Sequence, residues 1–181
     1  MKDFKGQLIR LKFRDQKPID GIVIDYNDDW MLLKSNPADY IVDGYIIVKN
    51  HNIKNIVRGE EEKWREKVIK LKIIKTLKSK IPLDSLESIL KALTKRFGIF
   101  TLYTKEDDAC WLGKLKSIDE KLLVIDDLTT KGKWIGQMAF KTKEIRAIEF
   151  DTDYINSLKL VQRKSVQKRV AATKSINQRT G

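Results

Sequence analysis

Side chains that commonly do chemistry are scarce in this sequence. Its 181 residues include one histidine, His51, and one cysteine, Cys110. His51 falls in a predicted turn, where a solvent-facing role is ordinary, and no basic partner near Cys110 in sequence argues for an activated thiol. The acidic cluster Glu106-Asp107-Asp108 could bind a cation, but carboxylates in a hairpin turn are usually just solvated. Without a glycine-rich phosphate loop or metal-ligand spacing, we predict no catalytic residues, no metal, no cofactor and no enzyme activity.

Basic residues are more informative, because they exceed acidic residues by 12 and are unevenly placed. Residues 1–59 and 98–153 carry net charges of +2 and −2, whereas residues 60–97 and 154–181 carry +5 and +7. A phosphate backbone is a natural partner for the two basic segments, and such binding weakens steeply with salt. Simple solvation of these side chains is the ordinary alternative. The candidate nucleic-acid contacts are Lys63, Lys67, Lys70, Lys78, Arg163, Lys164, Lys168 and Arg169.

Aromatic side chains are a second kind of candidate, since exposed rings stack on bases or pack against protein partners. Trp30 and Trp111 fall in predicted strands and are expected in the core. Tyr40 and Trp134 fall in long connections between predicted strands, where exposure is expected. We therefore take Tyr40 and Trp134 as candidate contacts to a base or a partner.

An internal repeat indicates which elements position these residues. A shift of 92 positions aligns residues 6–58 with residues 98–150 without a gap and places Gly6, Gly21 and Gly44 on glycines of the second window. Short apolar runs between polar turns predict five strands in each copy, and closure into a small barrel removes the exposed edges of such a sheet. The predicted strands span 7–13, 19–26, 30–34, 45–49 and 53–58, then 99–105, 109–118, 122–126, 137–142 and 145–150.

Helical patterns connect and follow the two copies. Residues 60–80 carry apolar side chains at spacings of three and four, including Trp64 and Val68, and Pro82 ends this segment. Asp84 is the predicted N-cap of a second helix that runs to Phe97. The tail begins with helical spacing and then becomes polar and basic, and we expect its last residues to be disordered. The predicted organisation is a barrel at 1–59, a helical connector at 60–97, a second barrel at 98–153 and a basic helix or tail at 154–181.

The segment between the second and third predicted strands resembles a known family. It reads GIVIDYN at 21–27 and GKLKSID at 113–119, the spacing Gly-x-aliphatic-x-x-apolar-Asp with Asn in the last place of the first copy. This resembles the first signature of Sm-like proteins, whose five-stranded, strongly bent SH3-like barrels bind uridine-rich RNA. The run DYIVDGYIIVKNHNIKNI (39–56) also resembles an uncharacterised bacterial family with this domain. The resemblance implies a mainly β fold with connecting α-helices, in which internal duplication relates two small five-stranded Sm-like barrels.

The resemblance is weaker at the positions that bind RNA in that family. The family's pocket Asn, four residues after the signature Asp, falls on Met31 and Leu123, and its pocket Arg falls on Asp43 and Ile135. The resemblance therefore implies the fold rather than the RNA pocket. Because Sm-like barrels associate edge to edge, one chain could mimic a dimer, or three chains could form a ring of six barrels, and the sequence leaves this choice open.

Together these observations predict a cytoplasmic, non-enzymatic binding or assembly module that contacts RNA or DNA through its basic connector and tail. No apolar run is long enough for a signal peptide or a membrane span, so no membrane partner is expected. The alternative is a protein–protein interaction scaffold without a nucleic-acid role, which recruits a partner or another copy through barrel edges and aromatic loops. An enzyme is the least favoured interpretation, because acid–base chemistry would depend on carboxylates and lysines with no recognisable pairing.

Overall fold

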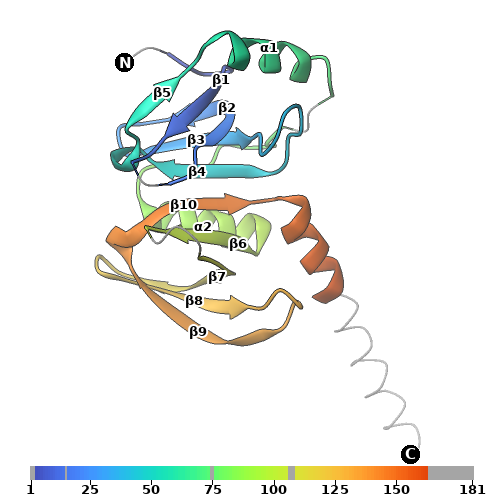
Figure 1. Ribbon diagram of the computed structural model, residues 1–181. Helices are drawn as coiled ribbons and strands as arrows, with labels where there is room; N and C mark the ends of the chain where they lie inside the picture. The colour runs from blue at the N-terminus through green and yellow to red at the C-terminus, as the bar shows by residue number, and fades with distance from the viewer. Residues whose placement is uncertain (1–2, 15, 74–75, 106–108, 163–181) are drawn as a thin grey trace, which may run out of the picture.

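The computed structural model describes residues 3–14, 16–73, 76–105 and 109–162, and the chain is mainly β, as predicted (Figure 1). In this described part of the chain, ten strands form one continuous antiparallel sheet. The first five strands are β1 (Leu8–Lys12), β2 (Ile19–Tyr26), β3 (Trp30–Ser35), β4 (Tyr45–Lys49) and β5 (Asn55–Val57). The second five are β6 (Phe100–Thr104), β7 (Cys110–Ile118), β8 (Leu122–Leu128), β9 (Trp134–Lys141) and β10 (Ile145–Phe150).

The strands follow the same order in the two halves of the sheet. The full order is β5-β1-β2-β3-β4-β10-β6-β7-β8-β9. We call β1–β5 the first half and β6–β10 the second half, and Figure 1 shows β4 and β10 side by side where the halves meet. Among the described residues, no pairing of β4 with β5 or of β9 with β10 closes either half. The two closed barrels therefore stay a prediction.

A glycine in the second strand of each half allows a close approach of the next strand. The pairing register shifts within β2–β3 and within β7–β8, which marks a β-bulge in both. A Cβ atom at Gly21 would lie 2.7 Å from the carbonyl oxygen of Lys34, and one at Gly113 would collide with the carbonyl oxygen of Asp126. Packing thus requires glycine at both positions, and their place beside the bulges agrees with the predicted bends.

Within the described residues three helices accompany the sheet: α1 (Glu60–Ile69), α2 (Leu86–Phe97) and a helix over residues 153–162. The single turns η1 (Asn50–Asn52) and η2 (Thr142–Glu144) precede β5 and β10. The prediction that α1 runs to about residue 80 is wrong. Leu71 and Ile73 are 84% and 105% exposed, so residues 71–73 supply no buried apolar side chain to continue the helix. The N-cap of α2 is Ser85 rather than Asp84, because the Ser85 Oγ accepts the Ser88 N–H at 3.1 Å.

The buried face of α1 is largely polar, which contradicts the predicted apolar stripe. Trp64 is 57% exposed, whereas Glu62, Arg65 and Glu66 are buried, together with Ile69. The apolar spacing misled because ion pairs to the first half, rather than apolar contacts, determine which face of α1 turns inward.

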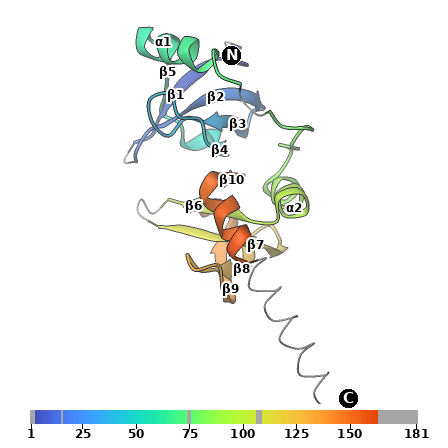
Figure 2. The same ribbon diagram turned by 90° about the vertical axis from the view of Figure 1, so that its right-hand side faces the viewer.

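The largest apolar cluster is shared between the halves. It joins Leu32 and Ile47 of the first half to Phe100 and Ile148 of the second, and Leu90 of α2 packs into it. Figure 2 shows α2 beside the second half near the junction, with α1 at the opposite end of the first half. The two small halves therefore stabilise each other, as their limited size requires. No helix within the described residues is long and apolar enough to span a membrane.

Candidate functional site

The junction between the halves is a buried strand pairing. β4 and β10 pair from Tyr45 opposite Phe150 to Val48 opposite Ala147. The rings of Tyr45 and Phe150 stack with their centroids 5.3 Å apart, and both residues are buried. Apart from Glu149, which lies opposite Ile46, the paired residues are apolar or aromatic, and their burial excludes water and holds the two halves in one arrangement.

Gly44 allows the chain to enter this junction. Its φ is +57°, and a Cβ atom there would lie 2.6 Å from Cγ2 of Thr152 and 2.7 Å from the carbonyl oxygen of Phe150. Gly136, 92 positions later, has φ +136° but no atom within 4 Å of the corresponding Cβ position. The difference arises because β10 covers the end of β4, whereas the described residues place nothing over β9.

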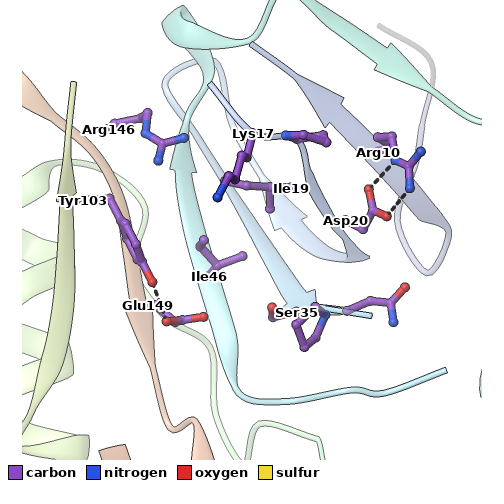
Figure 3. Close-up of a pocket in the computed structure, with 12 residues that line it drawn as sticks. Arg10, Lys17, Ile19, Asp20, Ser35, Ile46, Tyr103, Arg146 and Glu149 are labelled. Atoms are coloured by element: carbon purple, nitrogen blue, oxygen red, sulfur yellow. Dashed lines mark hydrogen bonds and ion pairs between the residues drawn. The ribbon is translucent and has the colours of Figure 1, made fainter. Parts of the chain in front are cut away.

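A cavity of about 400 Å³, the seam cavity, opens beside the junction and is lined from both halves (Figure 3). The Tyr103 hydroxyl donates to Oε2 of Glu149 at 2.9 Å. Burial raises the pKa of Glu149, and burial together with the Glu149 charge raises the pKa of Tyr103. A buried carboxyl group with a raised pKa can serve acid–base chemistry. Among the described residues, however, the only hydrogen bond of the Glu149 carboxyl is to the Tyr103 hydroxyl, which itself resists ionisation.

A larger cavity of about 710 Å³, the basic cavity, lies at the same junction and shares Arg146 with the seam cavity. The Gln16 amide donates to the Lys105 carbonyl oxygen at 3.0 Å and so links the two halves here. All ionisable lining residues within the described part of the chain are basic or histidine. The lining consists of Phe13, Arg14, Gln16, His51, Asn52, Ile53, Lys54, Lys105 and Arg146.

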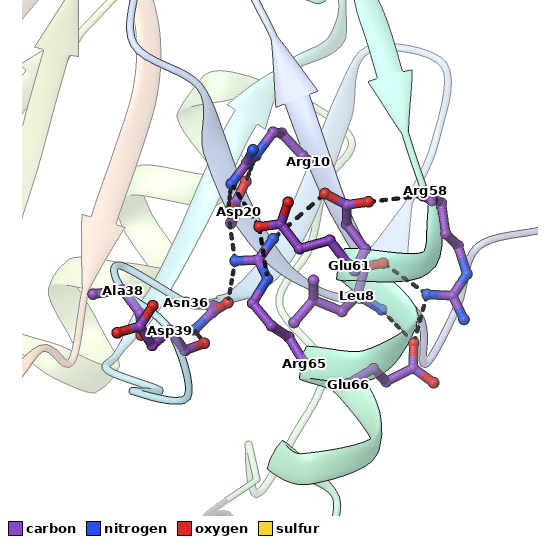
Figure 4. Close-up of polar contacts among 12 residues, drawn as sticks. Leu8, Arg10, Asp20, Asn36, Ala38, Asp39, Arg58, Glu61, Arg65 and Glu66 are labelled. Carbon is purple, nitrogen blue, oxygen red and sulfur yellow. Dashed lines mark hydrogen bonds and ion pairs between the residues drawn. The ribbon is translucent and has the colours of Figure 1, made fainter.

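A polar network fixes α1 against the first half (Figure 4). Asp20 accepts two hydrogen bonds from Arg10 at 2.8 Å and one from Arg65 at 2.7 Å, and Arg65 also donates to the side-chain oxygen of Asn36 at 3.1 Å. Burial alone would raise the pKa of Asp20, but the hydrogen bonds from Arg10 and Arg65 lower it below its usual value. The network is therefore a structural anchor whose charges are already neutralised.

Glu66, the residue that follows Arg65 in α1, provides a second anchor. Its Oε2 accepts the backbone N–H of Leu8 and lies 2.8 Å from Nη1 of Arg58. Burial opposes ionisation of Glu66, yet bonds from Lys70 and the Leu8 N–H lower its pKa. The carboxylates of both anchors are paired with cations within the chain, so neither offers a free charge to a ligand.

The outer strands β5 and β9 each pair on one side only within the described structure. β4 is buried from Tyr45 to Val48, whereas the corresponding residues of β9 are exposed at Gln137 and Ala139, partly exposed at Met138 and buried only at Phe140. The two outer strands therefore present unpaired backbone groups, which are the usual means by which sheets pair with another chain.

The lysines predicted as nucleic-acid contacts in the connector do not converge on one site. Lys63 and Lys70 pair with Glu60 and Glu66 at 2.6 and 2.5 Å. Lys67 lies 5.8 Å from the ring centroid of its neighbour Trp64, and Lys78 is exposed. The described residues do not include the other four predicted contacts, Arg163, Lys164, Lys168 and Arg169, or the acidic cluster 106–108. The prediction that the last residues are disordered also concerns a segment outside the described residues.

Tyr40 and Trp134 are both partly exposed, at 38% and 43%. The Tyr40 hydroxyl accepts a hydrogen bond from the indole N–H of Trp64 at 3.4 Å. Nζ of Lys114 lies over the Trp134 ring, 4.9 Å from its centroid. Trp134 begins β9 and does not lie in a loop, because that strand starts three residues earlier than predicted. The structure thus gives the two aromatics separate neighbours in separate halves.

His51 lies at the mouth of the basic cavity, next to residues that the sequence analysis did not select: Arg14, Lys54 and Lys105. These residues were missed because β4–β10 pairing, which no local pattern reveals, brings them together. Cys110 is exposed on β7, and partial burial of its sulfur and the nearby Glu149 raise its thiol pKa, which disfavours a reactive thiolate. Within the described ranges no group of three or more His, Cys, Asp or Glu residues could hold a metal ion.

Comparison with protein-family models, curated proteins and solved structures finds no match to this chain.

Proposed function

We propose that this chain is a non-enzymatic assembly module of two Sm-like barrels, one in each half, that pairs with further copies of itself through its outer strands. The observation that carries the proposal is the β4–β10 pairing, because it joins one half to the next head to tail. The shared strand order and the bulge beside Gly21 and Gly113 support two related barrels and an origin by duplication.

The internal junction provides a geometry for pairing between copies. It uses the fourth strand of the first half and the fifth strand of the second. The remaining fourth and fifth strands, β9 and β5, are the outer strands, each paired on one side only within the described residues. A heterologous contact of this kind repeats, so copies add in a row or close into a ring. Transferring the register of β4 and β10 by 92 positions sets Met138 opposite Val57 of the next copy and Ala139 opposite Ile56 of the next copy.

Pairing between copies should be weaker than the internal junction. The buried strand β4 begins Tyr-Ile-Ile-Val, whereas residues 137–140 of β9 are Gln-Met-Ala-Phe. Less apolar area would be buried, at about 25 cal/mol per Å² of stabilisation. We therefore expect reversible association that depends on protein concentration.

Sedimentation velocity over a range of protein concentrations tests this proposal. Ala139→Lys puts a charge where the corresponding Ile47 is buried at the internal junction, and lysine on an edge strand disfavours pairing. Leu71→Lys is the matched control, because it adds the same charge at a side chain that is 84% exposed outside the sheet. The wild type and Leu71→Lys should associate as concentration rises, while Ala139→Lys stays monomeric. A wild-type chain that stays monomeric throughout contradicts the proposal.

The charge distribution favours a second candidate function, contact with RNA or DNA through the basic connector and tail. Residues 60–97 and 154–181 hold the net positive charge, whereas the rest of the chain is nearly neutral. Filter binding of generic RNA across a salt series, with and without residues 163–181, tests it. Binding that weakens with salt and falls on truncation supports this candidate, and unchanged retention after truncation favours a scaffold without a nucleic-acid role.

A further inference from the structure

The basic cavity is a candidate ligand site separate from the outer strands. We propose that it binds a phosphate group carried by a nucleotide or by a nucleic-acid strand. The site needs no second copy, because every lining residue belongs to one chain. It can therefore exist whether or not the chain assembles through β9 and β5.

The charge of the cavity favours an anion. Arg14, Lys54 and Lys105 are exposed around it, and none of the three forms an ion pair with a described residue. His51 and the amide of Asn52 lie beside them and can donate hydrogen bonds. A concave surface lined by one sign of charge concentrates its field on the space inside, so an anion that enters is attracted by several groups together.

This arrangement differs from that of the paired basic groups on α1 and in the first half. Lys63 and Lys70 on α1 pair with glutamates, and Arg10 and Arg65 are bound to Asp20. Those cations are already neutralised at close range, so a phosphate would have to compete with a carboxylate for each of them. The basic cavity offers three cations for which the described residues provide no such competitor.

Arg146 adds a buried, well-oriented cation to the lining. It is 8% exposed, and its guanidinium carbon lies 5.3 Å from the ring centroid of Phe13 and 5.9 Å from that of Tyr103. Aromatic contacts of this kind restrict the planar group to a few orientations, which reduces the entropy lost when it contacts a ligand. Arginine forks also match the geometry of phosphate oxygens.

Both halves supply the site from corresponding positions. Phe13 and Lys105 are 92 positions apart, as are Lys54 and Arg146, and all four line the cavity. The hydrogen bond from Gln16 to the Lys105 carbonyl fixes the two sides together. The site therefore depends on the β4–β10 junction, and neither half alone would form it.

The size of the cavity favours a ligand larger than a phosphate ion. Its volume of about 710 Å³ lies within the range of ordinary small-molecule sites, roughly 300–1,000 Å³. The amides of Gln16 and Asn52 can donate to or accept from a base or a sugar beside the phosphate. A mononucleotide, or one nucleotide of a strand, satisfies both the charge and the volume.

Fluorescence anisotropy with a labelled oligouridylate, and competition by ATP, test the proposal. The variant Arg14→Gln, Lys54→Gln, Lys105→Gln removes three charges from the cavity and leaves Arg146 in place. The control Lys116→Gln, Lys121→Gln, Lys131→Gln removes the same charge from exposed positions of the second half that line neither cavity. We expect the cavity variant to bind at least about tenfold more weakly and the control to change by less than about threefold, because charge-assisted hydrogen bonds are lost only in the first.

The competition distinguishes the two sources of the phosphate. Displacement of the oligouridylate by ATP indicates a nucleotide site, and binding of the oligouridylate alone indicates a strand; either result supports the proposal if the cavity variant loses it. Lys54→Arg, which keeps the charge, should retain binding, and unchanged thermal unfolding of the cavity variant verifies its fold. Equal loss in the two triple variants, or no binding of either probe by the wild type, overturns the proposal.

Discussion

The helices that follow the two halves hold corresponding places but are fixed by different chemistry. α1 follows β5 and is bound through Arg65 and Glu66 to charged and backbone groups of the first half. The helix at 153–162 follows β10 and packs Ile155 and Leu158 into a small apolar cluster with Leu128. In each half, the position of the helix is thus set by the strand that precedes it. A polar network holds the helix in the first half, and an apolar cluster holds it in the second.

The largest difference between the halves is expected at the glycines before the fourth strands. Gly44→Ala combines a left-handed backbone with a collision against Thr152 and Phe150, so we expect a loss of about 4 kcal/mol in the free energy of unfolding. Gly136→Ala strains the backbone but meets no neighbouring atom, so we expect about 2 kcal/mol. Urea denaturation of both variants measures the difference, and an equal or larger loss at Gly136 would contradict the account of the junction.

A smaller contrast is expected when each helix loses its anchor. Arg65→Ala removes ion pairs to Asp20 and Glu62, and Leu158→Ala removes a buried apolar side chain, so each should cost about 2–3 kcal/mol. Added salt should reduce the cost at Arg65, because it screens charges, and should leave the cost at Leu158 unchanged. Denaturation at low and high salt measures this, and the same salt dependence for both variants would argue against it.

Acid should weaken the polar attachment of α1 through both Asp20 and Glu66. The pKa values of Asp20 and Glu66 are lowered in the folded chain, so their stabilising contribution is complete above the unfolded values of about 3.9 and 4.3 and is lost as pH falls through the folded values. The wild type should therefore lose stability in this acidic range, and Arg65→Ala should lose less. Thermal unfolding against pH checks this, and parallel curves for the two proteins would exclude a role for Asp20.

Local sequence patterns were sufficient for most strands and failed where contacts are distant. The predicted spans of β2 and β4 agree with the structure because polar turns with Asn and Asp delimit them. The limits of α1 were wrong because its buried face is charged, and apolar spacing carries no information on ion pairs. The N-cap of α2 was predicted one residue too early, at Asp84, because aspartate and serine are both favoured N-caps and stand next to each other in the sequence.

The candidate site depended on information that the sequence holds only indirectly. Tyr45 to Val48 is apolar at every position, a pattern typical of a strand covered on both faces, but it does not name the covering strand. Because β10 is that strand, Lys105 and Arg146 come to lie near Arg14 and Lys54, which are far away along the chain. The net charge of each segment identified the basic connector and tail. It could not reveal a basic cavity that is built from two segments, 1–59 and 98–153, each of which is nearly neutral.

Amide hydrogen exchange at several protein concentrations tests most directly whether β9 and β5 pair between copies. The amides of β4 are covered within one chain and should exchange slowly at every concentration. Exchange at Gln137 to Lys141 and at Asn55 to Val57 should slow as concentration rises, and Ala139→Lys should abolish this change. Exchange in β9 and β5 that does not vary with concentration would contradict the account.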